Sequence, residues 1–286
     1  MSSAGTTRTR PRRKRAAPTP PARLFPVSSL GHTVILPKLL RWNIDQADPT
    51  FLAFVVLLHV GTATALLIYF WRDWLAIARG VLRSVIDGRM HGTPDERLGW
   101  RLIAGTIPVG LAGVLLQKQV QALFASPRAA AVFLIINGGI MFAGERLRRR
   151  ATMFEEGRTA LDRLSVPTAV GIGSAQILAL LPGISRSGSS MVAGLFANLT
   201  HEAAARFAFL LATPVIFGAG VLKIPDLFTP VALPHLPVYL LAGVVAGVAA
   251  FLSVAYLMRY FRVGQLDPFA YYCAAFGILS LILLSR

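Results

Sequence analysis

Long apolar segments alternate with short polar or basic connectors along most of the chain. Six of these segments stay apolar over roughly one bilayer thickness, which is typical of transmembrane helices. They cover approximately residues 51–71, 102–124, 129–144, 203–222, 236–258 and 269–284. The pattern therefore predicts an all-α polytopic membrane protein.

Two polar stretches interrupt the apolar pattern, and both contain a Pro-x-x-Ser core. The later stretch, 181–191, places Arg186 among serines and glycines, and the earlier one, 25–32, has the ionisable His32 in place of the arginine. An ionisable residue at membrane depth is costly unless it faces a partner or a wet cavity, so both stretches are candidate functional sites.

Both stretches also break a helix, because they carry proline and glycine. Non-helical backbone at membrane depth survives only where it is buried in protein or lines a cavity. Each region is too short and too polar for two crossings, so we predict two re-entrant helical hairpins beside about six transmembrane helices. Broken polar segments in corresponding halves of a chain indicate a site between inverted repeats near the membrane midplane.

The basic residues gather in connectors between apolar segments. Connectors 72–101 and 145–163 flank one pair of predicted spans, so they lie on the same side, which the positive-inside rule makes cytoplasmic. The nearly uncharged loop 223–235 is then external. With this topology the first polar stretch enters from outside and the second from the cytoplasm, as inverted repeats require.

Composition agrees with this interpretation. The chain is 55% apolar and only 15% charged, with a mean hydropathy of +0.60. Its net charge of +16 is explained by membrane topology, so we expect no nucleic-acid partner. The single cysteine, Cys273, excludes an internal disulfide and a cysteine metal cluster, and we interpret it as a packing residue. We interpret His59, inside the first span, as a helix-packing or carbonyl-bonded histidine rather than a catalytic one.

The two polar stretches together have the chemistry of a phosphate site. Helix N-termini bind anions, and the guanidinium of Arg186 matches phosphate oxygens. Serine hydroxyls add donors, while His32 can move a proton near neutral pH. Close helix packing is the alternative role for serine and glycine in a bilayer, but Arg186 and His32 favour the functional interpretation.

These residues resemble the two signature motifs of the bacterial undecaprenyl-diphosphate phosphatase family, also called bacitracin-resistance proteins. The matching stretches are Phe-Pro-Val-Ser-Ser-Leu-Gly-His at 25–32 and Gln-Ile-Leu-Ala-Leu-Leu-Pro-Gly-Ile-Ser-Arg-Ser-Gly at 176–188. The resemblance implies a catalytic centre of Ser29, His32 and Arg186, with either Ser29 or His32 attacking phosphorus. It implies substrate-binding roles for Ser28, Gly31, Gln176, Gly183, Ser185, Ser187 and Gly188.

The chain departs from this family at one place. The family carries two glutamates four residues apart before its first motif, associated with a divalent cation, whereas Thr19 and Arg23 stand there in this chain. The resemblance thus implies Mg²⁺ or Ca²⁺ with no ligands identifiable here, and the chain as written is expected to be poorly active. We interpret residues 1–23 as a disordered basic segment or the product of a wrong start or frame, and 24–286 as the membrane domain.

The resulting hypothesis is hydrolysis of undecaprenyl diphosphate to undecaprenyl phosphate and phosphate. In the family this reaction recycles the lipid carrier for peptidoglycan synthesis and confers bacitracin resistance. The expected partners are a polyprenyl diphosphate lipid and the bilayer of the bacterial inner (plasma) membrane. The sequence leaves open whether the chain forms a homodimer. The alternatives are a lipid-phosphate flippase or transporter, and an inactive relative that only binds lipid phosphate.

Overall fold

The computed structural model describes residues 27–42, 49–90, 92–124, 126–151, 161, 164–230 and 232–285. Within these ranges the chain folds into α-helices and short 3-10 segments, which confirms the predicted all-α class. The interpretation of residues 1–23 concerns positions outside the described residues.

Several of the described helices are suited to a bilayer. Five are long and apolar enough to cross a membrane, and the count reaches six if the bent pair α2–α3 forms one span. The spans are α2 (Pro49–Tyr69), α4 (Pro94–Leu115), α6 (Pro127–Ala151), α9 (His201–Lys223), α10 (Leu236–Tyr260) and α11 (Asp267–Leu284). The predicted polytopic architecture is therefore confirmed.

The connector predicted at 72–101 is largely helical, which the hydropathy pattern missed. Helix α3 (Trp71–Ile86) turns away from α2 by 83° and is amphipathic. Its arginines lie along one side, whereas Leu82, Val85 and Ile86 stay exposed beside them. Exposed apolar residues next to basic ones are typical of a helix lying in the membrane interface.

The span predicted at 102–124 also has different ends. Helix α4 begins at Pro94, because the Thr93 side chain caps it by accepting from Glu96 N at 3.3 Å. It ends at Leu115, and a separate helix, α5 (Gln117–Phe124), follows. The charged first turn of α4 masked the helix start, since it lowers the local hydropathy.

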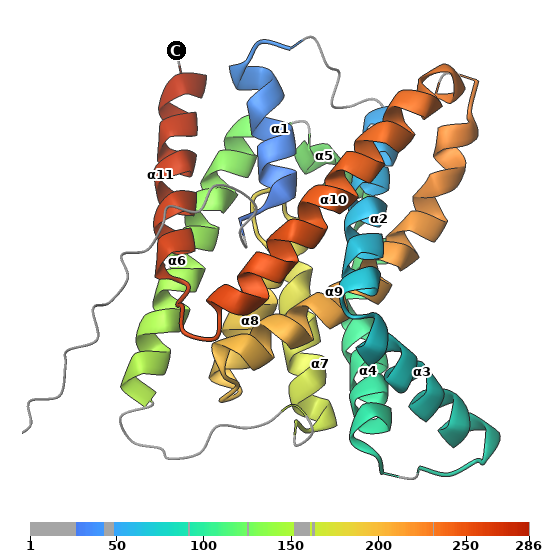
Figure 1. Ribbon diagram of the computed structural model, residues 1–286. Helices are drawn as coiled ribbons and strands as arrows, with labels where there is room; N and C mark the ends of the chain where they lie inside the picture. The colour runs from blue at the N-terminus through green and yellow to red at the C-terminus, as the bar shows by residue number, and fades with distance from the viewer. Residues whose placement is uncertain are drawn as a thin grey trace, which may run out of the picture.

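The two halves of the chain run in opposite directions (Figure 1). Helix α1 (Ser29–Leu39) rises from the middle of the molecule, after which α2 descends, α4 rises and α6 descends. Helix α8 (Arg186–Phe196) descends from the middle, after which α9 rises, α10 descends and α11 rises. Each element of the second series is thus reversed relative to its counterpart, as inverted repeats require.

Small residues bring helices from the two halves into close contact. A Cβ on Gly61 of α2 would lie 2.2 Å from the carbonyl oxygen of Gly243 on α10. A Cβ on Gly138 of α6 would lie 2.7 Å from the carbonyl oxygen of Ala270 on α11. Such contacts allow backbone-to-backbone packing, which holds helices together where the lipid supplies little hydrophobic drive.

The connectors lie towards the two ends of the molecule. The α3–α4 turn and the C-terminal end of α6 lie at the lower end in Figure 1, and the α10–α11 turn lies in the lower half of the molecule. Polar contacts gather there, including the hydrogen bond from His201 Nε2 to Glu145 at 2.7 Å and the ion pair of Arg149 with Asp267. The η3–η4 segment (Ile224–Phe228 and Leu233–His235) lies at the other end. The helices thus separate the connectors as predicted, and the assignment of the lower end to the cytoplasm stays a prediction.

Candidate functional site

Two half-helices begin in the interior of the molecule, and each has a serine as its N-cap. The Ser28 hydroxyl accepts from Gly31 N in α1, and the Ser185 hydroxyl accepts from Gly188 N in α8, both at 3.1 Å. These bonds satisfy one of the free N–H groups at each helix start. The predicted Ser28, Gly31, Ser185 and Gly188 therefore have structural roles at the two breaks.

The approach to α8 has the form of a re-entrant segment. Helix α7 (Val166–Ser174) continues into the 3-10 segment η2 (Ala175–Leu180), and α8 then returns towards the same end (Figure 1). The break at 181–185 contains the proline and glycine that prevent a continuous helix. In the first repeat only the returning arm, α1, lies within the described residues.

The two polar stretches contact each other directly. Besides capping α1, the Ser28 hydroxyl accepts a hydrogen bond from Gly183 N at 3.2 Å, across 155 residues of sequence. Gly183 has a φ of +112°, and a Cβ there would lie 2.3 Å from the carbonyl oxygen of Ala130. A Cβ on Gly31 would lie 2.9 Å from Gly183 Cα. Only glycine fits at Gly183, which explains its place in the motif.

Asn137 of α6 holds the backbone of the second break through a hydrogen bond. Its Oδ1 accepts from Ser185 N at 2.9 Å, and its Nδ2 donates to Cys273 Sγ of α11 at 3.4 Å. The side chain is fully buried. Asn137 was not among the residues predicted from the sequence, although an amide within an apolar span is a recognisable signal.

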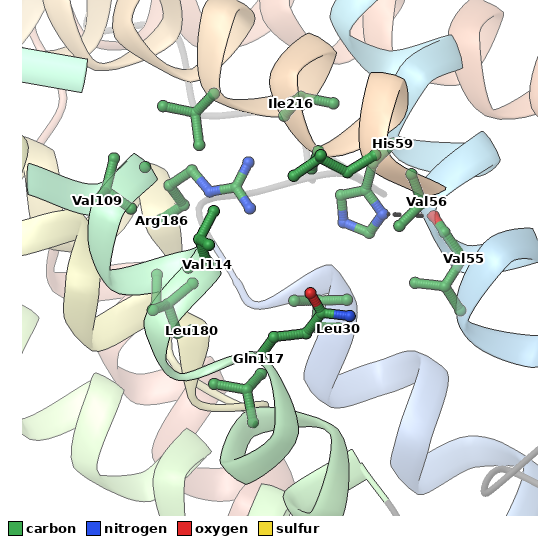
Figure 2. A pocket seen from close by; sticks show the side chains of 17 residues that line it. Leu30, Val55, Val56, His59, Val109, Val114, Gln117, Leu180, Arg186 and Ile216 are labelled. Carbon is green, nitrogen blue, oxygen red and sulfur yellow. Dashed lines mark hydrogen bonds between the residues drawn. The ribbon is translucent and has the colours of Figure 1, made fainter. Parts of the chain in front are cut away.

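A cavity of about 210 Å³ lies between α1, α2, α4, α5, η2, α8 and α9. Its walls are almost wholly apolar, and its polar members are His59, Gln117 and Arg186. Figure 2 shows the Arg186 guanidinium and the His59 ring pointing towards one another across it. No acidic partner for Arg186 occurs among the described residues, so the cavity presents a positive charge in apolar surroundings.

His59 is held in one orientation by α2 and contacts the first polar stretch. Its Nδ1 lies 2.7 Å from the carbonyl oxygen of Val55, and its Nε2 lies 3.2 Å from the hydroxyl oxygen of Ser29. The predicted carbonyl bond is therefore present. The contact with Ser29 was not predicted, although an ionisable group inside a span could have suggested it.

His32 occupies a different environment from His59. Its Nδ1 lies 2.7 Å from the Ser28 carbonyl oxygen, and its Nε2 lies 2.9 Å from the Tyr272 hydroxyl. The ring stacks on Phe276 with a centroid distance of 4.7 Å. His32 thus joins α1 to α11, and it does not belong to the residues that line the cavity.

Two other predicted residues also stand apart from the cavity lining. Gln176 is fully buried in η2, and both amide atoms are without a hydrogen-bond partner among the described residues. The Ser187 hydroxyl lies 3.3 Å from that of Ser185, beside the cap of α8. Of the predicted site residues Arg186 alone lines the described cavity, and Ser29 is linked to it through the contact with His59.

The donor set of the cavity does not suit the divalent cation that the family resemblance implies. Mg²⁺ and Ca²⁺ prefer oxygen ligands, above all carboxylates. No aspartate or glutamate belongs to the described cavity lining. No group of three or more His, Cys, Asp or Glu that could hold a metal occurs in the described part of the chain. Positions 19 and 23 lie outside that part.

The fold defines an integral membrane protein in which the half-helices of two inverted repeats meet beside a cavity lined by Arg186. The chain belongs to the family described as "Bacitracin resistance protein BacA", whose sequence model matches residues 22–279. It is 54% identical to the undecaprenyl-diphosphatase of Acidiphilium cryptum over 91% of this chain and 93% of that protein. It is 48% identical to the undecaprenyl-diphosphatase of Mycolicibacterium paratuberculosis, with 92% of each chain covered. It is 46% identical to undecaprenyl-diphosphatase 2 of Chromobacterium violaceum, over 91% and 92% of the two chains.

Proposed function

We propose that this chain hydrolyses undecaprenyl diphosphate to undecaprenyl phosphate and inorganic phosphate. The reaction would recycle the lipid carrier of peptidoglycan synthesis and protect the cell against bacitracin. Family membership and the names of relatives that cover nine-tenths of the chain support this activity. We place the protein in the bacterial inner (plasma) membrane as a multi-pass protein.

The observation that carries the proposal is the Arg186 guanidinium, which points into an apolar cavity without an acidic partner in the described structure. A charge in such surroundings is costly unless a ligand of opposite charge compensates it. A planar guanidinium donates to two phosphate oxygens at once, so a lipid diphosphate is a suitable ligand. Val55, Val109 and Ile216 provide apolar walls for the first units of its polyprenyl chain.

The half-helices support the same chemistry. Because α1 and α8 both begin beside the junction of the two polar stretches, their N-terminal N–H groups and positive dipole ends converge there. Charge that builds on the phosphoryl oxygens during transfer would be stabilised by these groups and by Arg186. A group in the first stretch, Ser29 or His32, would attack phosphorus or activate water.

A divalent cation, held by ligands outside the described residues, is a separate proposal that rests on the family resemblance alone. Such an ion would neutralise diphosphate charge when bound. The steps proposed above are therefore written with the chain's own groups. A homodimer likewise stays a prediction.

Phosphate release from undecaprenyl diphosphate by the purified full chain in detergent tests the proposal. We expect inorganic phosphate and undecaprenyl phosphate in equal amounts, with heat-denatured protein as the control. A flippase needs two leaflets and releases no phosphate, so lipid movement in vesicles without release would favour a transporter. Binding of the lipid with neither movement nor release would indicate an inactive relative.

A further inference from the structure

We infer that His59 is the general base that removes the proton from Ser29, which makes Ser29 and His59 a catalytic pair. This inference rests on the proposed function, because it assigns roles within the same site. It also decides between Ser29 and His32 as the attacking group.

The tautomer of His59 follows from its contacts. The Val55 carbonyl oxygen, 2.7 Å from Nδ1, can only accept, so Nδ1 carries the ring proton. In the neutral ring Nε2 is then an acceptor, and the Ser29 hydroxyl at 3.2 Å is its donor. A nucleophile within hydrogen-bond reach of a base, with the base oriented by a third group, is the arrangement that activates a serine.

His32 has the same carbonyl bond but a different second partner. Its Nε2 accepts from the Tyr272 hydroxyl, and its ring stacks against Phe276. These contacts leave no free ring nitrogen for a substrate or water. His32 therefore acts as a positioning residue that holds α1, and with it Ser29, against α11.

The position of the pair fits the transfer of a phosphoryl group. The ring of His59 points into the cavity opposite Arg186 (Figure 2), and Ser29 is exposed at the start of α1. A terminal phosphate held by Arg186 would lie between the guanidinium and the Ser29 hydroxyl. The apolar cavity walls would keep bulk water away from the phosphate.

The reaction balances in two steps. Ser29 Oγ forms a bond to the terminal phosphorus as the bond from that phosphorus to the bridging oxygen breaks. The serine proton passes to His59 Nε2 and from there to undecaprenyl phosphate, which leaves with the bond electrons, so His59 is neutral again before the second step. In the second step water attacks phosphoserine and gives its proton to His59. The Ser29 oxygen then leaves phosphorus and is reprotonated, so the sum is one water consumed per phosphate released.

Two measurements on the full chain in detergent test the pair. The first is the pH dependence of phosphate release for the wild type, His59→Gln and His59→Ala. We expect kcat/KM to fall about 100-fold or more in both variants and the acidic limb of the pH profile to disappear. Imidazole should restore part of the rate in His59→Ala, because the truncated side chain leaves space beside Ser29. His235→Gln, an exposed histidine in η4, is the matched control and should keep the wild-type rate and profile.

The second measurement reports on Ser29 without the natural substrate. A fluorophosphonate with a long alkyl chain transfers its phosphonyl group to an activated serine and releases fluoride, and mass spectrometry locates the label. We expect labelling of Ser29 in the wild type, none at that site in Ser29→Ala, and at least about tenfold slower labelling in His59→Gln.

The outcomes separate the pair from the proposed function. If Ser29 of the wild type is labelled, labelling slows in His59→Gln and the wild type releases no phosphate, the result supports the pair and contradicts the proposed phosphatase activity. Normal phosphate release with an unchanged pH profile in a folded His59→Gln protein would overturn the pair and leave the phosphatase standing. Equal labelling of wild type and His59→Gln, or no label at Ser29, would also overturn the pair.

Discussion

Ser29 and Arg186 occupy the same position in the two half-helices, each being the first residue after a capping serine. The sequences that follow the caps, Ser-Leu-Gly and Arg-Ser-Gly, place glycine at the third position in both, where it donates to the cap. One repeat thus contributes a hydroxyl and the other a guanidinium from equivalent positions. The site is asymmetric in chemistry although its backbone is built from related elements.

Replacing Arg186 tests its role as the phosphate ligand. Arg186→Lys keeps a positive charge but loses the bidentate fork, so we expect phosphate release to fall at least about 100-fold, and further in Arg186→Ala. The measurement is kcat/KM in detergent, with the thermal unfolding midpoint as the control for folding. Near-wild-type turnover in a folded Arg186→Lys protein would remove Arg186 from the mechanism.

Replacing Gly183 tests the junction of the two stretches. Gly183→Ala forces a Cβ to within 2.3 Å of a backbone oxygen at a φ of +112°, so we expect a loss of at least about 2 kcal/mol in stability. Denaturation in detergent measures this change. Gly139→Ala on α6 is the matched control, because a Cβ there meets nothing within 4 Å and alanine favours a helix. Equal stability of the two variants would contradict the described junction.

Asn137 should matter through the bond it accepts. Asn137→Ala leaves the buried Ser185 N–H without its acceptor, which costs about 1–3 kcal/mol. The unfolding midpoint should fall, and kcat should fall with it because Ser185 is the N-cap of α8, which begins at Arg186. Cys273→Ala is the comparison, since it removes only the weak sulfur contact of Asn137. A larger effect from the cysteine change would show that the sulfur, not the backbone bond, is the important partner.

Cysteine labelling in intact cells tests the assignment of sides. Trp42→Cys and Leu233→Cys should react with an impermeant maleimide, whereas Met90→Cys and Val263→Cys should react only after the membrane is opened. The native Cys273 is buried and provides a low background. Labelling of Trp42→Cys and Met90→Cys from the same side would contradict the inverted-repeat topology.

Hydropathy and motif spacing predicted most of the fold. Long apolar segments have one stable solution in a bilayer, so the six spans and the re-entrant segment before Arg186 could be located from sequence alone. Helix α3 was missed because an interfacial helix mixes arginines with leucines and resembles a polar loop in average hydropathy. The start of α4 was missed because its first turn is charged.

The site was predicted in part. Arg186, Ser29 and the glycines of the two polar stretches stand out in the sequence. A charge or a helix break at membrane depth is costly and therefore indicates a function. The partners Asn137, Tyr272 and His59 come from other helices, and sequence distance hides such contacts. For His59 the carbonyl bond was expected correctly, but a ring has two nitrogens, and only the structure shows what the second one contacts.

The bond between Ser28 and Gly183 also constrains how such a protein could have arisen. Each half supplies one capped break, and the two breaks face each other only because the halves cross the membrane in opposite senses. A chain of half this length, inserted in one orientation, would contribute a hydroxyl or a guanidinium to the site but not both. Two copies of such a chain inserted in opposite orientations would bring two capped breaks together, but both breaks would carry the same side chain. Gene fusion would then have fixed the two orientations and freed each half to specialise.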